Sequence, residues 1–209
     1  DLVSESEVVI AGTEPITEHV MARGKRLRLI SRVGVGLDSV DLLAAERRGI
    51  QVSYTPEAPA PAVAELTIGL MLSILRSVHV ANAQMHRGEW ERHFGRRISE
   101  LTIGIIGAGR IGARVLRLLG AFGAARVLVN DIRPNPLVAP HPRFEWAAKE
   151  YIYREADLIS LHVPLTPETK NMIRGEHLLM MKPDAAIVNT ARGGIINEKE
   201  LAKALSSGH

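Results

Sequence analysis

The stretch that decides the fold is "TIGIIGAGRIGARVLRLLGAFGAARVLVNDI", residues 102–132. Runs of Ile, Leu and Val flank Gly107, Gly109 and Gly112, which form the pattern G-x-G-x-x-G. This order predicts a strand, a tight turn and a helix. The first glycine permits the turn, the second lets the backbone approach a pyrophosphate, and the third lets the helix pack on the strand. Taken alone, the pattern also fits an ordinary strand-to-helix turn.

Asp131 favours the binding interpretation. It ends the next predicted strand, where a carboxylate accepts both ribose hydroxyls of an adenosine and repels a 2′-phosphate. The helix that starts at Arg110 and Ile111 supplies unpaired N–H groups for the phosphates. The sequence therefore predicts a dinucleotide, with NAD favoured over NADP. Arg133 leaves NADP open, because an arginine there could bind a 2′-phosphate.

Short apolar runs alternate with helical patterns along the whole chain, which predicts an α/β fold with a doubly wound parallel sheet. Strands are expected at 7–11, 28–33, 50–53, 101–106, 126–130, 143–146, 157–162 and 185–189. Helices are expected at 15–23, 40–48, 62–86, 110–121, 148–155, 175–181 and 197–206. In the usual order of such sheets, strand 101–106 lies beside strand 157–162, with 185–189 beyond it.

A proline-rich connector, "YTPEAPAPA" at 54–62, is the expected domain boundary. Three prolines within six residues cannot continue a helix or a central strand. We therefore expect a small, partial α/β domain at 1–60 and a larger one at 61–209. The sixth strand of the larger sheet would have to follow residue 209.

The composition excludes several classes of function. Aromatic residues make up 4% and basic residues are scattered, which does not fit nucleic-acid binding. The chain has no cysteine, which excludes disulfides and thiolate chemistry and fits a reducing compartment. No apolar run reaches the length of a membrane span and no signal peptide is recognisable, so we expect a cytoplasmic protein without a membrane partner.

Five segments together carry a resemblance to a known family. They are "SRVGVGLDSVD" (31–41), "VAELTIGLMLSILR" (63–76), "GIIGAGRIG" (104–112), "ADLISLHVPLTPETKNMI" (156–173) and "MKPDAAIVNTARGGIINEKEL" (181–201). In this order they resemble the D-isomer-specific 2-hydroxyacid dehydrogenases, and most of all the 3-phosphoglycerate dehydrogenases among them. The resemblance implies a Rossmann-type NAD-binding domain joined to a smaller, flavodoxin-like α/β domain that binds substrate.

The resemblance also implies the site residues. Arg192 of "ARGG" would be catalytic, because a planar guanidinium can hold a carboxylate and polarise the adjacent carbonyl of a 2-oxo acid. Backbone N–H groups of Val35 and Gly36 would bind the substrate carboxylate. The cofactor would be bound by Gly107, Gly109, Arg110, Ile111, Gly112, Asp131, His162, Val163, Pro164, Thr169, Thr190 and Ala191, and no metal site is expected. His162 is expected beside the cofactor but not as the general base.

The implied function is interconversion of a D-2-hydroxy acid and its 2-oxo acid with NAD, in a homodimer built on 63–85 and the segment that follows. An alternative is an NAD(H)-sensing regulatory protein, resembling the corepressors of this fold. The family's acid/base histidine and its carboxylate partner are expected beyond residue 209, so the chain is expected to be an inactive fragment that also lacks the family's N-terminal start. Pro59 replaces an asparagine that the related formate dehydrogenases use, which disfavours that reaction.

Overall fold

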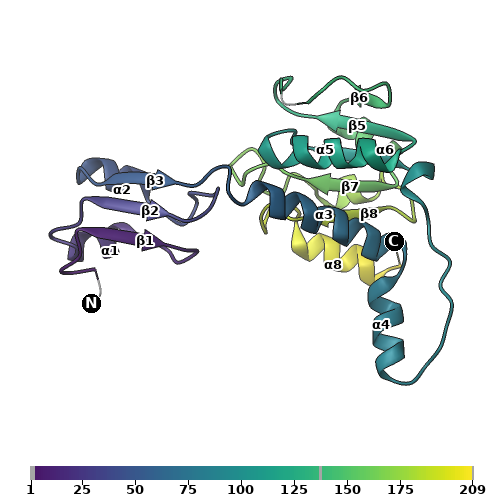
Figure 1. Ribbon diagram of the computed structural model, residues 1–209, viewed down its shortest axis with the longest axis horizontal. Coiled ribbons are helices and arrows are strands. Elements are labelled where there is room, and N and C mark those ends of the chain that lie inside the picture. The colour runs from purple at the N-terminus through teal and green to yellow at the C-terminus, as the bar shows by residue number, and fades with distance from the viewer. Residues whose placement is uncertain (1–2, 137, 209) are drawn as a thin grey trace. The chain divides into compact units, whose positions relative to one another are not determined.

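The computed structural model describes residues 3–136 and 138–208 (Figure 1). The chain divides into two compact units, Asp1–Ala60 and Pro61–His209. The assignment of substrate binding to the first unit remains a prediction.

The first unit is a three-stranded parallel sheet in the order β1-β2-β3. Its elements are β1 (Val8–Ala11), α1 (Glu18–Arg23), β2 (Leu29–Arg32), α2 (Leu42–Arg47) and β3 (Gln51–Tyr54). Strand residues that alternate toward one face, such as Ala11 and Ile30, pack with Met21 of α1 and Ala44 of α2. The loop that leaves the central strand β2 contains Val35 and Gly36, so it lies at the carboxyl end of the sheet.

The second unit is a five-stranded parallel sheet in the order β6-β5-β4-β7-β8, which confirms the predicted neighbours of the glycine-loop strand. Its strands are β4 (Thr102–Ile106), β5 (Arg126–Asn130), β6 (Phe144–Trp146), β7 (Leu158–Leu161) and β8 (Ala186–Asn189). Its helices are α3 (Ala60–Leu75), α4 (Val78–His86), η1 (Ile98–Glu100), α5 (Arg110–Phe122), α6 (Lys149–Glu155), α7 (Gly175–Leu178) and α8 (Glu198–Ser206).

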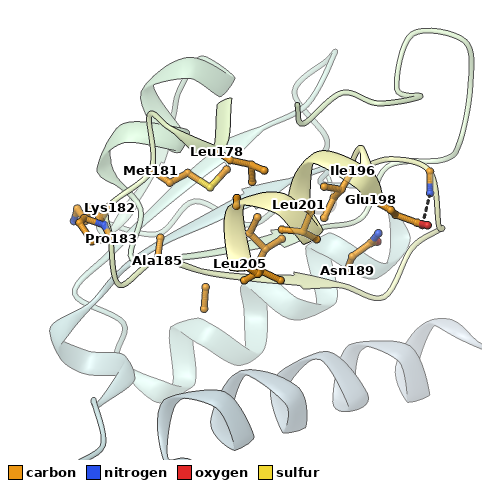
Figure 2. Close-up of a pocket in the computed structure, with 14 residues that line it drawn as sticks. Leu178, Met181, Lys182, Pro183, Ala185, Asn189, Ile196, Glu198, Leu201 and Leu205 are labelled. Atoms are coloured by element: carbon orange, nitrogen blue, oxygen red, sulfur yellow. Dashed lines mark hydrogen bonds between the residues drawn. The ribbon is translucent and has the colours of Figure 1, made fainter. Parts of the chain in front are cut away.

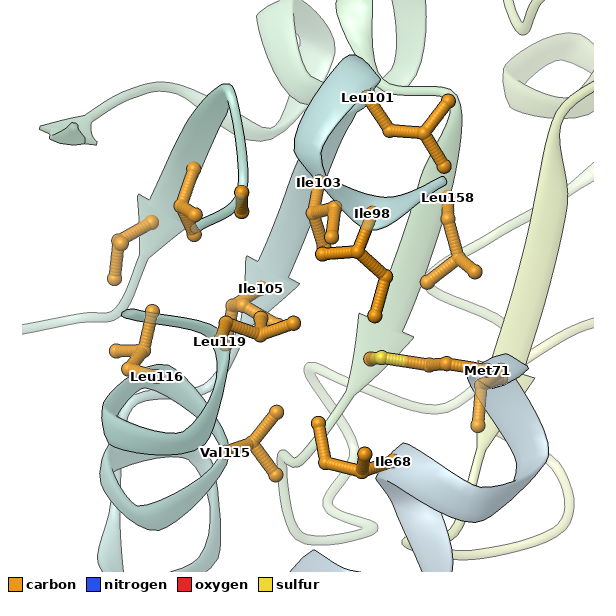
Figure 3. Packing of buried hydrophobic residues seen from close by; sticks show 14 of the residues in the cluster. Ile68, Met71, Ile98, Leu101, Ile103, Ile105, Val115, Leu116, Leu119 and Leu158 are labelled. Carbon is orange, nitrogen blue, oxygen red and sulfur yellow. The ribbon is translucent and has the colours of Figure 1, made fainter. Parts of the chain in front are cut away.

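Hydrophobic clusters cover both faces of this sheet, as the consecutive apolar residues of β4 predict. Ile103 and Ile105 face α3 and α5, and Figure 3 shows them packed with Ile68, Met71 and Val115. Ile106, on the opposite side, packs in a second cluster with residues of α6, α7 and α8. All strand pairs of this sheet are parallel, so the loops at their carboxyl ends meet at one edge of the sheet.

The predicted single helix at 62–86 is wrong, because the helix breaks after Leu75. Ser77 adopts a left-handed conformation, with φ 50° and ψ 34°. The chain therefore turns, and α3 and α4 are bent by 69° relative to each other. Among the described residues no single helix is long and apolar enough to cross a membrane, and only this bent pair meets the criteria jointly.

Asn197 and Glu200 have the spacing of a capping box at the start of α8, and in the structure this box forms in part. The Asn197 side chain accepts the N–H of Glu200 at 3.2 Å, as a helix N-cap should. The Glu200 carboxylate, however, accepts the N–H of Gly175 at the start of α7 rather than that of Asn197. The carboxylate thus ties α8 to α7.

Candidate functional site

The glycine loop between β4 and α5 has three glycines with three different constraints. Gly107 has φ +96°, and a β-carbon there would lie 2.6 Å from the carbonyl carbon of His162. A β-carbon on Gly112 would lie 2.0 Å from the carbonyl oxygen of Gly107. By contrast, a β-carbon on Gly109 would meet nothing within 4 Å. The outer two glycines are therefore required by the protein itself, and the middle one borders open space.

Unpaired donors face this space at the N-terminus of α5. Gly109 is the N-cap, and no side chain caps the helix. The N–H groups of Gly109, Ile111 and Gly112 have no hydrogen-bond partner among the described residues. Donors at a helix N-terminus favour an anion, so the loop fits the pyrophosphate of a dinucleotide.

Asp131 follows β5 and contacts the glycine loop directly. Its Oδ2 accepts the N–H of Ala108 at 2.6 Å, and its Oδ1 accepts the N–H of Arg133 at 3.4 Å. Asn135 donates from Nδ2 to the carbonyl oxygen of Ala108 at 2.6 Å. The carboxylate predicted to select the ribose therefore also holds the loop in shape.

His162 lies at the end of β7 against the same loop. Its Nε2 is 2.9 Å from Oγ of the fully buried Ser160, and its Nδ1 is buried without a hydrogen-bond partner in the described structure. Burial lowers the pKa of His162 to about 4, so the imidazole is neutral at physiological pH. A buried imidazole of this pKa is a poor general base, and the non-catalytic role of His162 stays a prediction.

The depressed pKa of His162 predicts a loss of stability in acid. The unfolded chain, with a histidine pKa near 6.5, binds a proton at a pH where the folded chain does not. The free energy of unfolding should therefore be highest above about pH 6.5 and fall by up to about 3 kcal/mol as the pH drops to about 4. Urea unfolding of the protein and of His162→Asn between pH 7 and 4.5 measures this. Equal acid losses in both proteins would contradict it.

The loop that leaves β7 contains three more predicted cofactor residues, Val163, Pro164 and Thr169. The Thr169 hydroxyl donates to the carbonyl oxygen of Pro164 at 2.6 Å and accepts the N–H of Thr166 at 2.8 Å. Thr169 thus closes the loop on itself. Its contact with a cofactor remains a prediction.

Arg192 lies on the loop that leaves β8, two strands from the glycine-loop strand and at the same carboxyl edge of the sheet. The side chain is partly exposed, and its Nη1 donates to the carbonyl oxygen of Ala191 at 2.8 Å. Three residues brace the loop: Asn189 bonds to the backbone of Ala191 and Arg192, Thr67 of α3 contacts Thr190, and Glu198 accepts the N–H of Gly194 at 3.2 Å. The Arg192 guanidinium thus extends from a loop that several hydrogen bonds hold in place.

In the first unit, the loop after β2 presents donors of its own. It is held by Thr55, whose Oγ1 accepts the N–H of Gly34 at 2.8 Å. The N–H groups of Val35 and Gly36 have no acceptor in the part of the chain that the structure describes. Two adjacent free N–H groups suit a carboxylate.

A hollow of about 500 Å³ lies beside β8 and is lined mainly by apolar side chains of α7, α8 and the strand itself (Figure 2). None of the predicted site residues lines it, although Asn189 and Glu198 do. Among residues 3–136 and 138–208, no group of three His, Asp or Glu side chains is placed to bind a metal ion.

These features of the second unit define a class of protein. A glycine loop with open space at its middle glycine, an acid after the next strand and this strand order constitute a Rossmann-type dinucleotide-binding domain. The profile of "D-isomer specific 2-hydroxyacid dehydrogenase, NAD binding domain" matches residues 68–209, and the chain belongs to this family. NAD is accordingly the cofactor of this domain, as predicted.

Relatives extend the similarity over nearly the whole chain. D-3-phosphoglycerate dehydrogenase of Methanocaldococcus jannaschii is 42% identical over 96% of the chain, which spans 38% of that protein. Hydroxypyruvate reductase of Thermotoga maritima is 37% identical over 99% of the chain, which spans 67% of that protein. The crystal structure of D-lactate dehydrogenase from Aquifex aeolicus with NAD and lactic acid matches with a TM-score of 0.89 at 30% identity, over 99% of this chain and 63% of that one.

Three residues that touch the predicted site are absent from the sequence-based prediction. Asn189 has a local signal, since asparagine readily bonds to the backbone two residues later. Thr67 and Asn135 have none, because they contact residues that lie far from them in the sequence.

Proposed function

We propose that the protein is an NAD-dependent oxidoreductase that interconverts a D-2-hydroxy acid and its 2-oxo acid. The observation that carries the proposal is Arg192, held on the loop after β8 at the same sheet edge as the glycine loop. The test is oxidation of NADH by the full-length protein with a panel of 2-oxo acids, including hydroxypyruvate, glyoxylate and pyruvate. Absence of turnover with all of them, while NADH still binds, would favour the NAD(H)-sensing alternative.

NAD supplies a hydride acceptor, and the chain's residues bind and polarise the acid. Pyrophosphate binding is assigned to the N–H groups at Gly109, Ile111 and Gly112, and ribose binding to Asp131. Thr190 and Ala191, one and two residues before Arg192, are proposed to line the nicotinamide pocket. The Arg192 guanidinium would hold the substrate carboxylate and stabilise the negative charge that develops on the adjacent oxygen. His162 would frame the cofactor in its neutral form.

For the first unit, we propose that the N–H groups of Val35 and Gly36 bind a carboxylate of the acid. The support is their lack of acceptors among the described residues, on a loop at the carboxyl end of the central strand. A cytoplasmic location is also proposed, on the basis of the cysteine-free composition, which fits a reducing compartment.

Asp131→Ala is expected to lower the preference for NADH over NADPH by roughly tenfold or more, about 1.4 kcal/mol. The variant removes the ribose acceptor and the repulsion of a 2′-phosphate. It also removes the hydrogen bond to Ala108, so the ratio of the two affinities is informative and the absolute affinity is not. Fluorescence titration with both cofactors measures the ratio, and Asp131→Asn, which keeps an acceptor, is the matched control. Equal or tighter NADPH binding by the unchanged protein would refute the assignment.

We further propose a homodimer formed through α3, α4 and the segment after them. One side of α3 packs in the core through Ala64, Ile68 and Met71. On its other side Leu66, Leu70 and Ile74 are exposed at intervals of four residues. Trp90 and Phe94 are 79% and 103% exposed. Such a stripe fits a two-fold contact between identical helices.

The dimer proposal is tested by light scattering of the full-length protein at micromolar concentration. The expected mass is twice that of one chain. Leu70→Glu, which places a charge within the exposed stripe, should shift the mass toward one chain. A monomeric unchanged protein would refute the proposal.

A further inference from the structure

The loop that carries Arg192 is fixed from inside by Asn189. The Asn189 Oδ1 accepts the N–H of Ala191 at 3.0 Å, and its Nδ2 donates to the carbonyl oxygen of Arg192 at 2.7 Å. One side-chain amide therefore bonds to the backbone on both sides of the Ala191–Arg192 peptide. Asn189 itself is exposed and ends β8, so its position is set by the sheet.

The same loop is fixed from outside by Thr67, which lies on α3 and is fully buried. Thr67 Oγ1 lies 2.8 Å from the carbonyl oxygen of Val63 and 2.8 Å from Oγ1 of Thr190, a residue 123 positions later. Each of these two hydrogen bonds needs its own proton. The carbonyl oxygen of Val63 can only accept, so the hydroxyl of Thr67 must be the donor in that bond. The Thr67 proton therefore goes to Val63, and Thr190 donates its proton to Thr67.

We propose that Thr67 and Asn189 are positioning residues for Arg192. Thr67 bonds Thr190 to α3, and Asn189 bonds the backbone of Ala191 and Arg192 to the end of β8. Together they fix the backbone from which the guanidinium extends. The inference rests on the proposed function, because it assumes that Arg192 binds the substrate. Reacting groups that are displaced by about 1 Å can cost about a hundredfold in rate, so a small shift of this loop has a measurable effect.

The first test uses two substitutions of Thr67 in the full-length protein. Thr67→Val removes the hydroxyl at nearly constant size, and Thr67→Ser keeps it. We expect Thr67→Val to lower kcat/KM for the 2-oxo acid about tenfold and Thr67→Ser to stay within about threefold of the unchanged protein. The Kd for NADH should change less than about threefold in both, because the pyrophosphate loop is untouched. Equal losses of kcat/KM in the two variants would overturn the inference.

The second test asks whether Thr67 acts through Arg192. In an Arg192→Lys background, adding Thr67→Val should lower kcat/KM further by less than about twofold. The effects of substitutions at residues that act through one another are not additive. A further tenfold loss in that background would mean that Thr67 is merely structural, and would overturn the inference. A fully active Arg192→Lys enzyme would instead overturn the proposed function.

Asn189 provides an independent variant in case Thr67→Val fails to fold. Asn189→Ala removes both loop contacts from an exposed position, so the core remains intact. Its melting temperature should stay close to that of the unchanged protein, while kcat/KM falls at least tenfold. An Asn189→Ala enzyme with unchanged kcat/KM would refute the positioning role.

Discussion

Arg192→Lys is expected to lower kcat/KM for a D-2-hydroxy acid by about 30- to 1,000-fold, equal to a loss of about 2–4 kcal/mol of transition-state stabilisation. Lysine keeps the positive charge but loses the planar pair of donors that holds a carboxylate and the adjacent oxygen at once. In a site partly closed from water, such charge-assisted hydrogen bonds are at their strongest. Steady-state kinetics of the full-length protein measures the loss.

NADH affinity separates this effect from general damage. The Kd for NADH should change less than about twofold, because the cofactor contacts are assigned mainly to the glycine loop and Asp131. Arg117→Lys is the matched control, since Arg117 is exposed on α5 and belongs to neither proposed site. Near-normal kcat/KM for Arg192→Lys would show that the residue or the reaction is wrongly assigned.

Gly112→Ala is expected to abolish useful NADH binding, with an affinity loss of at least about a hundredfold, or about 2.7 kcal/mol. The added methyl group would lie 2.0 Å from the carbonyl oxygen of Gly107, so backbone on one side or the other must move. Overpacking of this kind costs about 1–3 kcal/mol of stability. The melting temperature should therefore fall by roughly 5 °C as well.

Gly109→Ala is the control for that variant, because it separates a loss of NADH binding from a loss of stability. A methyl group there meets no protein atom within 4 Å, so the melting temperature should not fall. It would, however, occupy the space assigned to the pyrophosphate, and NADH affinity should drop about tenfold or more. Fluorescence titration and thermal melting of both variants give the comparison. NADH binding by Gly109→Ala at normal affinity would place the pyrophosphate elsewhere.

Much of the fold could be predicted because the sequence repeats one local rule. Strands such as β4 are apolar on consecutive residues, and most of them, though not β5, are followed by a turn or loop and then a helical pattern. The break at Ser77 could not be predicted, since serine is not a usual residue for a left-handed conformation and the apolar pattern continues through it.

The candidate site likewise contains residues that the sequence could predict and contacts that it could not. Gly107, Gly112 and Asp131 stand at fixed spacings along the chain, and in the structure Asp131, after β5, bonds to the loop that contains the two glycines. The contact of Thr67 with Thr190 depends on how α3 packs on the sheet, which no local pattern encodes. Glu200 illustrates the limit, because its spacing predicts a bond to its own helix and the tertiary fold gives it a different donor.

The hydrogen bond from Ala108 to Asp131 has a consequence for the evolution of cofactor choice. If Asp131 selects NAD as proposed, a lineage that moves toward NADP must lose this carboxylate, yet its Oδ2 also accepts the N–H of Ala108 in the glycine loop. Asp131→Asn retains an oxygen at the same distance from the backbone and can keep that donor paired, whereas alanine or leucine leaves the N–H of Ala108 without this acceptor. Different substitutions of Asp131 on the way to NADP therefore differ in whether the glycine loop keeps the hydrogen bond of Ala108. A path through Asp131→Asn is expected to disturb the loop least, and Arg133 already stands two residues further along the chain.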